Sequence, residues 1–219
     1  MKALSLVMLC FMYLFGEIYV GIPGGYKDVF VKMINKYNST HNIKVTALYG
    51  PMGVLMAQAK LNNLDVILGD REKLQKNGFK NFVKLGYGKL VILTKEKLKS
   101  VNEINNLKRL ALPNPKGTTY GKAAAEAFKN LHLHPKTVVV SLMPQGINYL
   151  KISQCDGAVA NKTQEVLLKK RYYALEIPQE YYNPIVIGFC VLHKNRGAED
   201  FIKFLTSPEI ERYLQGYGI

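Results

Sequence analysis

Apolar and polar positions divide the chain into two alternating kinds of segment. Short apolar runs, typical of buried strands, occupy residues 17–22, 43–49, 64–70, 89–94, 109–115, 137–142, 156–160 and 185–192. Segments with apolar residues three or four positions apart, typical of helices, occupy residues 26–38, 54–61, 120–131, 146–153, 163–170, 197–205 and 208–215. This alternation predicts an α/β protein in which helices cover doubly wound, mostly parallel sheets.

Four of the predicted strand-to-helix connections consist largely of small residues. They read PGG, with Gly24 and Gly25; GPMG, with Met52 and Gly53; NPKGTTYG, with Thr119 and Tyr120; and MPQG, which ends at Gly146. Each opens a helix and so offers unpaired backbone N–H groups and the positive end of a helix dipole. Because doubly wound sheets bind ligands at the carboxyl ends of their strands, we expect an anion site where these loops meet. The alternative is that the glycines and prolines serve turn geometry alone.

Enzyme and nucleotide-binding motifs are missing from the sequence. There is no GxGxxG, GxxxxGK[ST], GxSxG or HExxH pattern. A Cys/His pair of Cys155 or Cys190 with His193 is an alternative, but buried thiols are the favoured interpretation. The chain also has no CxxC and no His-rich spacing, which argues against a dedicated metal site. We therefore expect a binding protein with no catalytic residues, no cofactor and no directly bound metal ion.

The charge of the chain is strongly positive. Thirty Lys and Arg residues against 16 Asp and Glu give a formal net charge of +14. The basic residues are scattered, and the densest cluster is KKR at residues 169–171. A generally basic surface is therefore favoured over binding of nucleic acid.

Residues 1–16 have the pattern of a secretory signal peptide. Lys2 precedes an almost wholly apolar run that is too short for a comfortable membrane span, and Gly16 offers a small residue for cleavage. An uncleaved anchor is the less favoured alternative. In an oxidising compartment Cys155 and Cys190 could pair, but both lie in apolar strand-like segments, and free thiols are favoured.

The segment RLALPNPKGTTYGKAAAEAFKNL, residues 109–131, resembles the strand, loop and helix of periplasmic molybdate-binding proteins, the solute-binding subunits of ABC importers. The C-terminal DFIKFLTSPEIERYLQGYGI is similar to the closing helices of that family, and the resemblance covers roughly the whole mature chain. It implies a two-lobed type II periplasmic-binding-protein fold with two crossing strands, residues 89–94 and 185–192. Lobe 1 would comprise residues 17–86 plus 194–219, and lobe 2 residues 87–193.

The resemblance also implies a function. A periplasmic monomer would hold molybdate or tungstate between its lobes, close on it, and deliver it to an ABC permease at the inner membrane. The metal atom of such an oxyanion would be held through its oxygens, by backbone N–H groups of the four loops.

Matched residue by residue, the implied site loses side-chain hydroxyls. The family's first-loop serine falls at Gly25, and its paired second-loop serines fall at Pro51 and Met52. The family's tyrosine falls at Ala160, next to Asn161, which is a substitute donor. Each hydrogen bond to a charged group contributes roughly 1.5–3 kcal/mol, so these losses predict weaker binding or another solute.

The backbone donors of the implied site are retained. Thr119 and Tyr120 match the third loop, and the N–H group of the fourth loop falls near Gly146. The ligand-binding residues that we expect are Gly24, Gly25, Met52, Gly53, Thr119, Tyr120, Gly146, Ala160 and Asn161. Replacement donors could come from Thr118, Thr119, Tyr26 or Lys27. The alternatives are a different anion or a metal chelate in the same fold, and, less favoured, an enzyme or a nucleic-acid binder of this fold.

Overall fold

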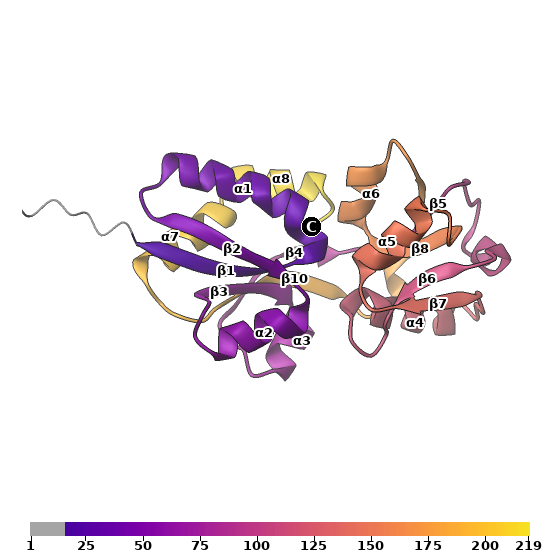
Figure 1. The fold of residues 1–219 in the computed structure, drawn as a ribbon, viewed down its shortest axis with the longest axis horizontal. Coiled ribbons are helices and arrows are strands. Elements are labelled where there is room, and N and C mark those ends of the chain that lie inside the picture. The colour runs from indigo at the N-terminus through magenta and orange to yellow at the C-terminus, as the bar shows by residue number, and fades with distance from the viewer. Residues whose placement is uncertain (1–15) are drawn as a thin grey trace, which may run out of the picture.

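The computed structural model describes residues 16–219, which form two lobes arranged along the long axis of the molecule (Figure 1). Each lobe contains a five-stranded sheet. The first sheet has the order β2-β1-β3-β10-β4 and comprises β1 (Glu17–Pro23), β2 (Lys44–Gly50), β3 (Val66–Asp70), β4 (Phe82–Gly88) and β10 (Ile185–Val191). The second has the order β7-β6-β8-β5-β9 and comprises β5 (Leu90–Thr94), β6 (Leu110–Pro113), β7 (Thr137–Val140), β8 (Gly157–Asn161) and β9 (Tyr173–Glu176).

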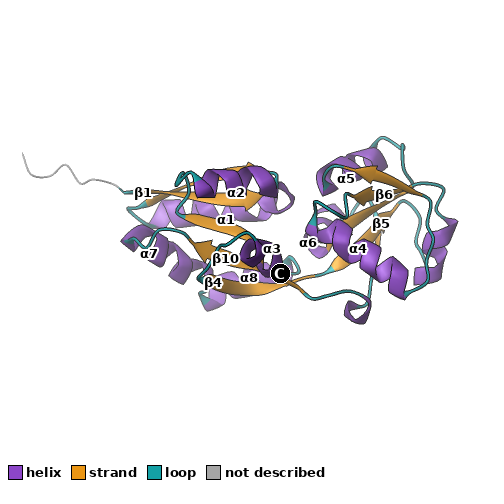
Figure 2. Ribbon diagram, turned by 90° about the horizontal axis from the view of Figure 1, so that it is seen from below, coloured by secondary structure: helices purple, strands orange, loops and turns teal. Residues whose placement is uncertain are grey.

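Helices cover both sheets (Figure 2). Those of the first lobe are η1 (Gly24–Tyr26), α1 (Lys27–Thr40), α2 (Met52–Lys60), α3 (Arg71–Lys76), α7 (Arg196–Leu205) and α8 (Pro208–Gly216). Those of the second lobe are η2 (Val101–Asn106), α4 (Thr119–Asn130), α5 (Met143–Lys151), α6 (Lys162–Leu168) and η3 (Gln179–Tyr181).

The two sheets share one topology. In the first, β1 pairs in parallel with β2 and β3, whereas β10 runs antiparallel to β3 and β4. In the second, β6 pairs in parallel with β7 and β8, whereas β5 runs antiparallel to β8 and β9. Each sheet therefore has four strands in one direction and one reversed strand, which enters from the other lobe. The predicted α/β fold with two mostly parallel sheets is confirmed.

The chain passes between the lobes twice. The first passage joins β4 to β5 through Lys89, and the second joins β9 to β10 through residues 177–184. The resemblance implies a crossing strand over residues 185–192, counted within lobe 2. In the structure, β10 hydrogen-bonds to β3 and β4 of the first sheet over Ile185–Val191. We therefore propose that the lobe boundaries lie near Lys89 and residue 184.

Besides the short helices η2 and η3, one α-helix and two strands are not apparent in the hydrophobic pattern. Helix α3 has the sequence REKLQK, with Leu74 as its single apolar residue, and strand β9 is largely exposed. Strand β4, FVKLGYG, is mostly half-buried and contains two glycines, so it lacks the continuous apolar run of a central strand. Helices α2 and α5 also begin earlier than predicted, at Met52 and Met143. Pro144 lies in the first turn of α5, where proline is tolerated, whereas Pro51 precedes α2.

Aromatic side chains fill one face of the first sheet. The rings of Tyr37 and Phe201, from α1 and α7, meet edge to face with centroids 5.1 Å apart. Phe30 of α1 meets Phe189 of β10 in the same way at 6.0 Å. Helices α2 and α3 cover the other face. Leu55 of α2 belongs to a second, smaller cluster of buried apolar residues there. The sheet is thus buried on both sides, which fixes the positions of its strand ends.

The predicted signal peptide and the two cysteines can be compared with the structure. Residues 1–15 of the predicted signal peptide lie outside the described part of the structure. Within residues 16–219, no helix is long and apolar enough to cross a membrane. Cys155, just before β8, and Cys190, in β10, are both buried and free, as favoured from the sequence.

Candidate functional site

A cavity of about 250 Å³ lies between the two lobes. The carboxyl ends of β1, β2 and β3 reach it from the first lobe, and the loops after β6, β7 and β8 reach it from the second. Its lining comprises residues 23–26, 50–52, 69–70, 117–120 and 142–144, together with Lys73, Asn161 and Ile187. Because parallel strands of a doubly wound sheet end at one edge, the shared topology of the lobes places two such edges face to face.

Three helices enter the cavity without a side-chain cap. Pro23 precedes η1, which leads directly into α1, while Pro51 precedes α2 and Leu142 precedes α5. None of these three residues accepts a hydrogen bond from its helix through a side chain in the part of the chain that the structure describes. The first N–H groups of a helix have no partner within the helix, so these entrances can donate to a ligand.

The entrance of α4 differs from the other three. Thr118 precedes it, and its hydroxyl accepts the N–H of Gly121 at 3.1 Å and donates to the carbonyl of Asn114 at 2.9 Å. Thr118 is therefore an N-cap that stabilises the helix. Its side chain is used within the loop, although it lines the cavity.

Three neutral side chains meet where the lobes touch. The hydroxyl groups of Tyr26, in η1, and Tyr120, in α4, lie 2.9 Å apart, and both residues are buried. Their mutual hydrogen bond uses one of the two hydroxyl protons and leaves the other free. Burial raises the pKa of Tyr26 to about 12, and the pKa of Tyr120 is also raised by burial and by Tyr26. Both hydroxyls are therefore protonated at neutral pH, and one of their two protons remains free to donate.

Asn161 completes this cluster from the end of β8. Only 1% of the residue is exposed, and it lines the cavity. Its Oδ1 accepts the N–H of Gln164 at 2.9 Å and so caps α6. Its Nδ2 is buried and lies near enough to the hydroxyls of Tyr26 and Tyr120 to offset part of the rise in pKa that burial causes in both, but it has no hydrogen-bond partner of good geometry among residues 16–219. A buried amide donor without a partner is costly, so this group indicates an acceptor atom in the cavity.

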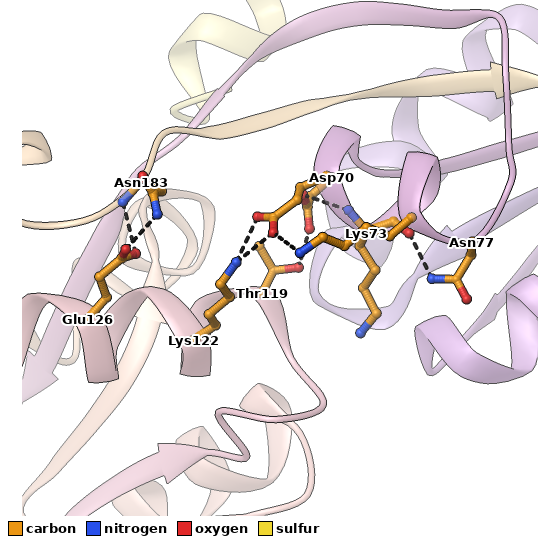
Figure 3. Close-up of polar contacts among 9 residues, drawn as sticks. Asp70, Lys73, Asn77, Thr119, Lys122, Glu126 and Asn183 are labelled. Carbon is orange, nitrogen blue, oxygen red and sulfur yellow. Dashed lines mark hydrogen bonds and ion pairs between the residues drawn. The ribbon is translucent and has the colours of Figure 1, made fainter.

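A carboxylate also lines the cavity. Asp70, at the end of β3, accepts the hydroxyl of Thr119 at 2.7 Å and the backbone N–H of Lys73 at 3.3 Å (Figure 3). The bond to Thr119 joins the first lobe to the second. The ammonium group of Lys73 donates to the carbonyl of Gly117, which is also in the second lobe. Burial lowers the pKa of Lys73, and the nearby charge of Asp70 opposes this effect.

Further polar contacts join the lobes around the cavity. Glu72 of α3 forms an ion pair with Lys122 of α4 at 2.7 Å (Figure 3). The side-chain amide of Gln164 donates to the carbonyl of Gly25 at 3.1 Å. The lobes are therefore in contact on more than one side of the cavity.

The cavity brings together six of the nine residues expected from the sequence. These six, which line it, are Gly24, Gly25, Met52, Thr119, Tyr120 and Asn161. Gly53 lies within α2 with open space where a Cβ would be, and Gly146 packs against Ala111 and Val140. Ala160 is fully buried in β8, one position before Asn161, and therefore faces away from the cavity.

The expected replacement donors are only partly available. Thr118 and Tyr26 line the cavity with hydroxyls that already have partners in the protein. Lys27 is exposed, and its ammonium group lies 5.8 Å from the ring centroid of Tyr49 instead of in the cavity.

Sequence reasoning missed several residues of the lining. Asp70 had a signal, because it ends the apolar run LDVILGD at the edge where ligands bind. Leu142 and Met143 stand at the entrance of α5, where the glycine of MPQG drew attention instead. Ile187 lies in the middle of β10 and gave no signal, because its place depends on the pairing of that strand.

Comparison with known proteins gives a family. The model of the family "Bacterial extracellular solute-binding protein" matches residues 18–219. A binding protein of Haemophilus influenzae is 24% identical, over 98% of this chain and 95% of that protein. The molybdate-binding protein of Rhodobacter capsulatus is 29% identical, over 52% of this chain and 47% of that protein.

Solved structures show the same fold. The periplasmic molybdate-binding protein of Azotobacter vinelandii has a TM-score of 0.77 at 19% identity, covering 92% of this chain and 97% of that one. PEB3, solved with bound L-phospholactate, has a TM-score of 0.72 at 17% identity, covering 92% of this chain and 98% of that one.

Proposed function

The chain belongs to the family of bacterial extracellular solute-binding proteins, and from this membership we propose that it captures a small anion between its lobes for an ABC importer. It would act in the periplasm as a monomer and present the closed, loaded form to a permease. No chemical step is needed, because ligand binding shifts an equilibrium between open and closed lobes.

The observation that carries this proposal is the unpaired amide of Asn161. Its Nδ2 is buried at the cavity beside the hydroxyl pair of Tyr26 and Tyr120. The uncapped entrances of α1, α2 and α5 add backbone N–H donors from both lobes. Donors that converge on one cavity from two lobes fit an acceptor-rich solute that binds best when the lobes close.

Molybdate or tungstate is the first candidate ligand. The relatives from R. capsulatus and A. vinelandii are named as molybdate-binding proteins. Backbone donors at the helix entrances and the amide of Asn161 would hold the oxyanion through its oxygens. The amide of Asn161 would then donate the hydrogen bond that the resemblance assigns to a tyrosine hydroxyl at position 160, where this chain has Ala160.

A small organic anion is the second candidate, favoured by the apolar part of the lining. Pro51, Met52, Leu142, Met143 and Ile187 all border the cavity. Such side chains offer little to a tetrahedral oxyanion but can bury a hydrocarbon segment. PEB3, which shares the fold, was solved with an anion of this kind.

Titration calorimetry of the mature protein tests the proposal. Molybdate, tungstate, sulfate and phosphate are titrated, followed by small carboxylates. Saturable heat with at least one anion is expected, together with a smaller radius of gyration in solution scattering when that anion is bound. Absence of heat with every anion at millimolar concentration would overturn anion binding and leave the fold intact.

A further inference from the structure

The cavity has a carboxylate in its wall, which is unusual for a site that binds anions. Asp70 is the one acidic residue of the lining within residues 16–219. Both contacts of its side chain are with donors, the hydroxyl of Thr119 and the N–H of Lys73. An ionised carboxylate accepts hydrogen bonds only and has about four acceptor positions, so Asp70 can take a further donor.

The charge of Asp70 is not neutralised by a neighbouring ion pair. Within the described residues, no Lys or Arg side chain lies within ion-pair distance of its carboxylate. Lys73 directs its ammonium group to the carbonyl of Gly117 instead. Burial raises the pKa of Tyr26, and the nearby charge of Asp70 adds a smaller increase, because the carboxylate lies close to the donor cluster.

A fully deprotonated oxyanion fits this wall poorly. Molybdate, tungstate and sulfate carry only acceptors, so any oxygen that approaches Asp70 meets a like charge without a hydrogen bond. A solute with a hydroxyl or ammonium group beside its acceptor oxygens would instead donate to Asp70. A site built to hydrogen-bond such a group discriminates strongly against analogues that lack it.

The size and lining of the cavity point to the same class of solute. A volume of about 250 Å³ equals the share of roughly eight water molecules, more than one tetrahedral oxyanion fills. The side chains of Met52 and Met143 border this space together with prolines, Leu142 and Ile187. A hydrocarbon segment would cover these groups and release water from them.

We infer that this protein selects a small organic anion with a hydrogen-bond donor next to its acceptor oxygens, such as a hydroxy acid, and that Asp70 receives that donor. This inference rests on the proposed function and names its solute class. The acceptor oxygens would bind Asn161 and the helix entrances, the donor would bind Asp70, and the hydrocarbon part would lie against the methionines.

Two pairs of probes test the inference, because each pair differs in a donor. Lactate is compared with propionate, which lacks the hydroxyl, and inorganic phosphate is compared with sulfate, which carries no proton at neutral pH. Calorimetry should give tighter binding of lactate and of phosphate, each by at least about tenfold over its partner. In Asp70→Asn, which keeps an N-cap residue for α3, both preferences should fall below about threefold.

A matched control removes a carboxylate elsewhere. Asp28 is exposed in the first turn of α1 and does not line the cavity, so Asp28→Asn should keep both preferences. Binding of propionate and sulfate as tightly as of lactate and phosphate would overturn the role of Asp70 and leave anion binding standing. Unchanged preferences in Asp70→Asn would also overturn the role of Asp70 and leave anion binding standing. Absence of binding by all probes, with molybdate and tungstate included, would instead overturn the proposed function and this inference with it.

Discussion

The hydroxyl groups of Tyr26 and Tyr120 lie 2.9 Å apart although the residues are 94 positions apart in the chain and belong to different lobes. Both rings are buried, and Tyr26 lies at the loop after β1 while Tyr120 lies at the start of α4. The pair can form only when the two lobes meet over the cavity. It is therefore a direct indicator of closure.

The first prediction concerns stability at high pH. Burial raises the pKa of Tyr26 from about 10 to about 12, so the folded protein keeps a proton that the unfolded chain loses. The resulting stabilisation, on the order of 3 kcal/mol, is complete below about pH 10 and is lost as the pH rises to about 12. Urea unfolding between these pH values should show that the free energy of unfolding falls more steeply with pH for the wild type than for Tyr26→Phe.

An exposed tyrosine gives the control for this experiment. Tyr173 is 52% exposed, so Tyr173→Phe should leave the pH dependence as it is in the wild type. Tyrosinate absorbance of the native protein should likewise change between wild type and Tyr26→Phe only at the high end of the titration. Equal slopes for Tyr26→Phe and the wild type would show that the tyrosine pair is not buried in solution.

The second prediction compares two contacts between the lobes. Thr119→Val removes the hydroxyl that donates to Asp70, and a hydrogen bond to a charged group contributes roughly 1.5–3 kcal/mol. Glu72→Gln removes the ion pairs with Lys122 and with Lys76, whose side chains are about half exposed or more, and each pair contributes up to roughly 1 kcal/mol. We expect the first variant to weaken anion binding by at least about tenfold and the second by less than about fivefold, measured by calorimetry. The reverse order would show that the ion pair, not the Asp70 contact, holds the lobes closed.

The third prediction concerns two glycines. A Cβ at Gly88, the last residue of β4, would overlap the hydroxyl of Tyr120. Gly88→Ala should therefore displace Tyr120, break its bond to Tyr26 and lower the free energy of unfolding by about 1–3 kcal/mol. Chemical unfolding measures this change.

Gly53 is the matched comparison, because it lies in α2 and a methyl group there would have no other atom within 4 Å. Gly53→Ala should raise the free energy of unfolding by up to about 1 kcal/mol, since alanine is the better helix former. It should leave the affinity for the bound anion unchanged. The resemblance implies that Gly53 belongs to the site, whereas the structure leaves it outside the cavity lining. A marked loss of affinity in Gly53→Ala would support the resemblance.

The fourth prediction concerns the two thiols. Cys155 and Cys190 lie in different lobes, and burial raises the pKa of Cys190 to about 11. A thiol of this kind reacts slowly, because the thiolate is the nucleophile. A reducing agent should leave the melting temperature unchanged, and an alkylating reagent should label both residues in urea but label Cys190 slowly in the native protein. Mass spectrometry that finds them unlabelled in urea would instead indicate a disulfide.

The sequence was sufficient for the repeated strand–helix order, because long apolar runs such as that of β10 are unmistakable. It was insufficient for the partner of β10, since pairing depends on the path of the whole chain. The loop glycines were found because turns restrict residue type. Gly146 was misplaced relative to the cavity because α5 begins three residues earlier, at Met143. The importance of Asp70 appears only when Thr119 of the other lobe is seen to contact it.

The fifth prediction tests the amide of Asn161, which carries the proposed function. Asn161→Asp keeps the oxygen that accepts the N–H of Gln164, and aspartate is as good an N-cap as asparagine. The variant should therefore keep the cap of α6, but burial of a carboxylate without a partner should lower its free energy of unfolding by more than about 1 kcal/mol. It replaces two buried donors by a second carboxylate in the cavity, so anion affinity should fall by at least about 100-fold.

A neutral variant separates the loss of the donors from the added charge. Asn161→Ser retains a capping oxygen, removes the amide and adds no charge, so its affinity should lie between those of the wild type and Asn161→Asp. Calorimetry measures all three proteins, with thermal unfolding as the check on folding. Wild-type affinity in both variants would mean that the Nδ2 group faces no ligand atom. The donors would then have to come from the helix entrances alone, because Tyr26 and Tyr120 already satisfy each other in part.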